Sequence, residues 1–106
     1  MQKFKLKDFT RGWIVGDFEP NIIRTKNFEF MVRQYNSGEV EPKHTHKIAD
    51  EITVIISGIF TMNEEKLTLG DIIHLSPGDS VDFKCIESGT TAVVKTPSII
   101  GDKFIG

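Results

Sequence analysis

Residues 38–58 read Gly-Glu-Val-Glu-Pro-Lys-His-Thr-His-Lys-Ile-Ala-Asp-Glu-Ile-Thr-Val-Ile-Ile-Ser-Gly, and they are the most informative part of the chain. One residue separates His44 from His46. Side chains on an extended segment repeat every second residue, so both imidazoles are expected to point to the same side. Glu51 begins a run of β-branched residues five positions later. A fold back between the two segments would bring its carboxylate beside the imidazoles.

Two imidazoles and one carboxylate on one side of a divalent ion form a facial triad. Such a triad leaves coordination positions open for a substrate or for oxygen, and it suits Fe(II), Mn(II), Ni(II) or Zn(II). Asp50 is an alternative carboxylate, but strand alternation places it on the side of Ile52, opposite Glu51. We therefore predict three ligands for one divalent metal ion: His44, His46 and Glu51.

The same segment resembles the first conserved motif of the cupin family. That motif is a Gly, five residues, His-x-His, three or four residues, Glu, six residues and Gly. Five positions of the chain fit it: Gly38, His44, His46, Glu51 and Gly58. The second cupin motif is partly present, from Gly70 to Gly78. The resemblance implies an all-β protein with the cupin double-stranded β-helix, a jelly-roll barrel, and it supports the metal triad.

The second motif departs from the family at its last metal ligand. The family places a histidine three residues after the Gly of that motif, where this chain has Val81. Val81 shares a strand face with Phe83 and Cys85, so this strand supplies no replacement ligand. The resemblance therefore implies a three-ligand site and argues against tight four-ligand binding.

Short β-rich runs separated by turn residues recur along the chain, and no helix is indicated. This pattern predicts an antiparallel sandwich or barrel. We expect one cupin domain over 1–106, with a motif-bearing core at about 28–96 and N-terminal strands within 1–27. The alternation of Lys3, Lys5 and Lys7 predicts an exposed edge strand. The other expected strands are 28–35, 52–56, 59–62, 67–69, 71–75, 81–86 and 91–96, with turns at Ser57-Gly58, 63–65 and Ser88-Gly89.

Composition narrows the function classes. Hydrophobic residues make up 39% of the chain and charged residues 26%, which indicates a folded protein. The net charge is −2 and the basic residues are scattered, which argues against nucleic-acid binding. The single cysteine, Cys85, excludes an internal disulfide and a four-cysteine zinc site. No segment resembles a signal peptide or is long enough to span a bilayer, so we expect a cytoplasmic protein without a membrane partner.

Several residues outside the triad are candidates for the site. His74 is interpreted first as a core or interface histidine. The alternative is a substitute ligand or general acid in the cavity, which makes His74 the one catalytic candidate. Cys85 is interpreted as a small buried core residue. Four further residues are considered as cavity walls, with packing or surface as the favoured interpretation: Trp13, Arg33, Gln34 and Tyr35.

Two functional hypotheses remain open. In the first, a metal-binding cupin binds or acts on a small molecule, such as a sugar or carboxylate, and the resemblance implies isomerase, epimerase or dioxygenase chemistry without selecting among them. In the second, a non-catalytic, metal-free cupin binds a small ligand such as a carbohydrate, which the absence of the fourth ligand supports. An aliphatic stripe lies opposite Glu51 and consists of Ile52, Val54 and Ile56. It predicts a homodimer under both hypotheses, and it would also suit a purely structural dimer module.

Overall fold

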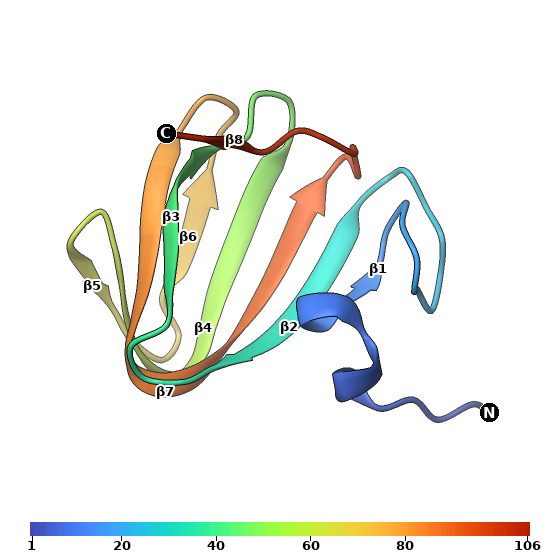
Figure 1. Ribbon diagram of the computed structural model, residues 1–106, viewed down its shortest axis with the longest axis horizontal. Helices are drawn as coiled ribbons and strands as arrows, with labels where there is room; N and C mark the ends of the chain where they lie inside the picture. Colours follow the sequence, from blue (N-terminus) through green and yellow to red (C-terminus); the bar gives the residue numbers. More distant parts are fainter.

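The computed structural model describes residues 1–106 and consists of β-strands with two short 3-10 helices at its N-terminal end (Figure 1). None of its helices has the length and apolar character needed to cross a membrane. The 3-10 helices are η1 (Leu6–Asp8) and η2 (Thr10–Gly12). The strands are β1 (Trp13–Val15), β2 (Glu29–Tyr35), β3 (Val40–Thr45), β4 (Asp50–Met62), β5 (Glu65–Leu67), β6 (Ile72–Leu75), β7 (Ser80–Thr96) and β8 (Phe104–Ile105).

The longest strand, β7, organises the sheet. Its first half pairs with β3 and its second half with β2, while β4 runs beside both halves, all antiparallel. Because β7 bends in the middle, the sheet rolls over on itself and encloses an interior (Figure 1). The short β8 pairs with β3 at the rim. The prediction of an all-β rolled sheet is confirmed.

Two predicted turns are instead bends inside continuous strands. Ser57-Gly58 lies within β4 and Ser88-Gly89 within β7, and the pairing register shifts at this point. The two strands approach closely here: a Cβ added to Gly89 would lie 2.1 Å from the carbonyl oxygen of Ser57. A glycine in a strand-like pattern marks either a turn or such a close approach, and sequence spacing does not separate the two.

Two further expectations need correction. The β4–β5 hairpin turns through only Asn63 and Glu64, whose φ angles are 49° and 68°. Positive φ at both central residues is the requirement of a tight two-residue hairpin, so Glu65 already belongs to β5. The edge strand predicted from Lys3 to Lys7 does not form, because η1 occupies part of this segment and β1 is the only named strand before residue 27.

An aromatic cluster packs in the hydrophobic core of the rolled sheet. Phe60 and Phe83 stack with ring centroids 5.0 Å apart, and Tyr35 meets each of them edge-on at 5.5 Å. Cys85 packs in the same core and is 2% exposed, as predicted. Ile52 lies on the outer face of β4, opposite the inward-facing Thr53, so the predicted alternation of this strand is confirmed.

Candidate metal centre

A pocket of about 90 Å³ lies inside the rolled sheet and is lined partly by residues of the aromatic core. Side chains from β2, β3, β4 and β7 form its walls, and η2 and the C-terminal segment contribute residues as well. Ten of its seventeen lining residues are polar or charged. All three predicted metal ligands are among them: His44, His46 and Glu51.

The two histidines are held in the same tautomer. His44 lies in β3 and His46 just after it; both are buried, with ring centroids 5.3 Å apart. His44 Nδ1 lies 3.0 Å from the carbonyl oxygen of Pro42, and His46 Nδ1 lies 2.9 Å from that of Asp102. A carbonyl oxygen only accepts hydrogen bonds, so each Nδ1 donates a proton. Each Nε2 is therefore left with a free lone pair when the ring is neutral.

Glu51 approaches His46 from β4, the next strand along the chain. It lies on the inner face of β4, as alternation predicts, and its Oε1 is 3.9 Å from His46 Nε2. Burial raises the pKa of the Glu51 carboxyl above its usual range. Asp50 lies on the outer face, where its Oδ1 is 2.9 Å from Nε2 of His74.

The donor chemistry of the three side chains fits a divalent ion. Imidazole and carboxylate ligands suit the first-row metals, and each imidazole carries the backbone hydrogen bond that metal-bound histidines usually make through their second nitrogen. As placed, however, no three His, Cys, Asp or Glu side chains converge closely enough to form a metal-binding group. Val81 is buried and pairs with His44 across β3 and β7, so the position of the family's fourth ligand is apolar.

A row of charged side chains crosses the sheet beside Glu51. Glu29, Lys95 and Glu51 are register neighbours on β2, β7 and β4. Lys95 Nζ lies 2.8 Å from Glu29 Oε1 and also 4.9 Å from the Trp13 ring centroid. Burial lowers the pKa of His46, and the positive charge of Lys95 lowers it further. Lys95 is not among the predicted site residues, although it is in phase with the inward-facing Thr91 and Val93.

A second ionic group lies between β2 and β3. Glu41 Oε1 is 3.0 Å from both Arg33 Nη1 and the Tyr35 hydroxyl, and Arg33 stacks over the Tyr35 ring. Burial, together with the Glu41 charge, raises the pKa of Tyr35. The packing or surface interpretation of Trp13, Arg33 and Tyr35 is therefore incomplete, because all three line the pocket. Only Gln34, which is exposed, lies elsewhere.

The C-terminal segment orients the histidine loop. Asp102 is 6% exposed, and its carboxylate accepts hydrogen bonds from the backbone N–H groups of Lys47, Ile48 and Ala49 at 2.9–3.2 Å. Burial acts to raise the pKa of Asp102, but these hydrogen bonds outweigh it and hold the pKa below its usual value. No local pattern in the sequence indicates this contact, because it joins residues more than fifty positions apart.

The alternative interpretation of His74 as a cavity residue is wrong, and so is a core position, whereas the interface interpretation stays a prediction. Its side chain is 58% exposed and pairs with Asp50 on the outer face of the sheet. Strand alternation explains the placement, because Ile73 and Leu75 point inward and His74 must point outward. His74 therefore contributes nothing to the pocket.

These features define the class of protein: the chain has the double-stranded β-helix fold of the cupins. It superposes on an uncharacterized conserved protein with a double-stranded β-helix domain from Klebsiella pneumoniae with a TM-score of 0.73 and 17% identity, over 99% of this chain and 91% of that one. A cupin-2 domain containing protein from Shewanella frigidimarina gives a TM-score of 0.59 and 13% identity, over 68% and 72% of the two chains.

A third similar structure is the DMSP lyase DddQ from Ruegeria pomeroyi, with a TM-score of 0.70 and 17% identity over 97% of this chain and 59% of that one. No protein-family model matches the chain, and no curated protein matches it in sequence. At these identities the structural likeness establishes the fold, and the function has to be argued from the pocket.

Proposed function

We propose that this cupin binds one divalent metal ion through His44, His46 and Glu51 and holds a small-molecule ligand in the same pocket. One observation carries the proposal: both imidazoles donate Nδ1–H to backbone carbonyl oxygens, which leaves each Nε2 free, and that of His46 lies 3.9 Å from the buried Glu51 carboxylate. A hydrogen bond of this kind fixes ring orientation and raises the basicity of the ligating nitrogen. The resemblance to the first cupin motif supports the same three ligands.

The other polar residues of the pocket are better suited to positioning a ligand than to transferring protons to or from it. Glu41 is engaged by Arg33 and Tyr35, and Lys95 is engaged by Glu29, so neither is free to act as a general base. A bound divalent ion would supply Lewis-acid polarisation of a ligand oxygen. The chain's own contribution would be to orient the ligand and to shield it from water with the apolar Val81 wall. Among the reaction types that the resemblance implies, this arrangement favours those that need no separate proton carrier.

A metal-free binding protein is the second candidate. Two observations favour it: the three donors do not form a closed ligand set, and Val81 replaces the fourth ligand. Under this hypothesis the same pocket binds a small neutral or charged molecule, such as a carbohydrate, without metal. The polar lining of the pocket is compatible with this role.

Metal analysis separates the two candidates. Protein purified without added metal or chelator is measured for Fe, Mn, Ni and Zn by mass spectrometry, with His44→Ala, His46→Ala and the outer-face control His74→Ala in parallel. We expect about one equivalent of metal in the wild type and in His74→Ala, and loss of it in the other two variants. Absence of metal from the wild type, with no change in melting temperature on adding chelator, would favour the metal-free protein.

A further inference from the structure

Among the residues that line the pocket, cations outnumber carboxylates. Four cationic residues line it, against the carboxylates of Glu41 and Glu51. Two of the cations are neutralised inside the fold, Arg33 by Glu41 and Lys95 by Glu29. The other two, Arg11 and Lys103, form no ion pair with any residue of the chain. With Glu29 and Glu39, the ion-pair partners of Lys95 and Arg33 outside the lining, cations and carboxylates balance, so Arg11 and Lys103 are the two lining cations that are free to pair with a ligand.

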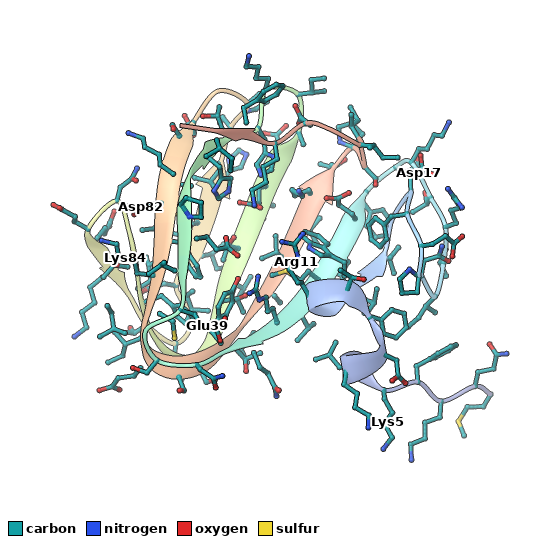
Figure 2. The ribbon with its side chains drawn as sticks, viewed as in Figure 1. Lys5, Arg11, Asp17, Glu39, Asp82 and Lys84 are labelled. Carbon is teal, nitrogen blue, oxygen red and sulfur yellow. The ribbon has the colours of Figure 1, made fainter.

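The backbone around Arg11 places it at the pocket. Arg11 has a φ angle of 49° within η2, and the next residue, Gly12, has a φ angle of 81°. A Cβ on Gly12 would lie 2.0 Å from the carbonyl oxygen of Val32, so η2 is pressed directly against β2. Figure 2 shows Arg11 on η2 beside the side chains that fill the rolled sheet. Its guanidinium group is therefore available to a ligand at the mouth of the pocket.

A second observation points to a ligand from the wall of the pocket. Thr91 lines the pocket, is 1% exposed, and its Oγ1 lies near the Tyr35 hydroxyl, which donates to Glu41, but makes no hydrogen bond of good geometry. A buried hydroxyl without a partner is costly and uncommon in native structures. Thr91 is the register neighbour of Arg33 on the inner face of the sheet. An oxygen atom of a molecule in the pocket would satisfy this hydroxyl.

We infer that the ligand of this pocket is a small organic acid whose carboxylate binds Arg11 and whose second oxygen-bearing group hydrogen-bonds to Thr91. A guanidinium group binds a carboxylate through two parallel N–H donors, which an alcohol or amide cannot match. The pocket is small, about 90 Å³, so the ligand is a short-chain acid. The inference rests on the proposed function, which places a small-molecule ligand in this pocket, but it does not require a bound metal ion.

Malonate and its neutral isostere malonamide test the inference by calorimetry on chelator-treated protein. We expect malonate to bind and malonamide to bind at least about tenfold more weakly, because the difference between them is the charge that Arg11 recognises. Arg11→Gln should weaken malonate binding about tenfold or more, and Arg11→Lys should retain part of the affinity. Thr91→Val should weaken malonate binding several-fold without lowering the melting temperature of the free protein, because it removes an unpaired buried hydroxyl.

Arg24→Gln is the matched control, since Arg24 pairs with Asp17 and Glu19 on the surface away from the pocket. The inference is overturned by equal binding of malonate and malonamide, by unchanged binding in Arg11→Gln, or by an equal loss in Arg24→Gln. Unchanged binding in Thr91→Val overturns the role of Thr91. The calorimetry uses chelator-treated protein. Failure of malonate to bind would therefore overturn this inference, and it would say nothing about whether His44 and His46 bind metal.

Discussion

The carbonyl oxygen of Asp102 lies 2.9 Å from Nδ1 of His46, while the carboxylate of the same residue holds the backbone N–H groups of the loop that follows His46. One C-terminal residue thus fixes both the tautomer of a proposed metal ligand and the loop leading to Glu51. The remote chain end is therefore part of the candidate metal centre.

Replacement of Asp102 tests this relationship. Asp102→Ala leaves three backbone donors without their acceptor, and we expect a loss of about 3 kcal/mol in the free energy of unfolding. Metal affinity should fall about tenfold or more, because the loop no longer holds His46 in place. Urea unfolding and metal titration measure the two effects. Asp79→Asn is the control, since Asp79 accepts one exposed backbone hydrogen bond and should have little effect.

Glu51→Gln should stabilise the metal-free protein and weaken metal binding, because the variant lacks the carboxylate ligand. Burial raises the pKa of Glu51, so the ionised carboxylate opposes folding at neutral pH in metal-free protein. The variant should unfold at a higher temperature than the wild type at pH 7 to 8. This advantage should shrink as the pH falls and disappear below the usual glutamate pKa of 4.5, where wild-type Glu51 becomes protonated in both states. Melting curves of chelator-treated protein across this range check the prediction, and an advantage that grows toward low pH would contradict it.

The buried pair of Lys95 and Glu29 should behave as a unit. Lys95→Met leaves the Glu29 carboxylate buried without its cation, and we expect a loss of about 3 kcal/mol in unfolding free energy. The double variant Lys95→Met with Glu29→Gln should recover much of that loss, because neither charge then remains. A double-mutant cycle in urea measures the coupling, and additive losses would show that the pair is not coupled.

Gly89 should tolerate no side chain. Gly89→Ala would place a Cβ 2.1 Å from the carbonyl oxygen of Ser57, so the β4 and β7 strands would have to separate where both bend. We expect a loss of more than about 3 kcal/mol or failure to fold. Gly38→Ala is the matched control: nothing lies within 4 Å of its Cβ, and only its φ angle of 92° opposes the change, at about 1–2 kcal/mol. Equal losses in urea unfolding would contradict the close approach.

The homodimer stays a prediction. Ile52, Ile56 and Ile72 are 44%, 46% and 64% exposed on the outer face of the sheet formed by β4 and β6. We expect light scattering at micromolar concentration to give twice the chain mass of 12.0 kDa. Ile52→Lys should give a monomer, whereas Val40→Lys, on the exposed side of β3, should not change the mass. A wild-type monomer at this concentration would contradict the prediction.

Local sequence determined the pattern of inward and outward side chains. The spacing of His44 and His46 and the phase of Glu51 follow from the two-residue repeat of a strand, which needs no knowledge of the partner strands. The same repeat puts Asp50, Ile52 and His74 on the outer face once the inner face is known, although it does not say which face is inside. Likewise the apolar phase of Val81, Phe83 and Cys85 predicts their burial.

Tertiary structure decided which distant groups share the pocket. Arg11 reaches it only because η2 is pressed on β2, and Asp102 reaches His46 only because β8, which follows it, pairs with β3. The pairing of Lys95 with Glu29 depends on the register of β7 against β2. Contacts between residues far apart in the chain are set by how the whole sheet rolls. The local alternation of side chains does not predict them.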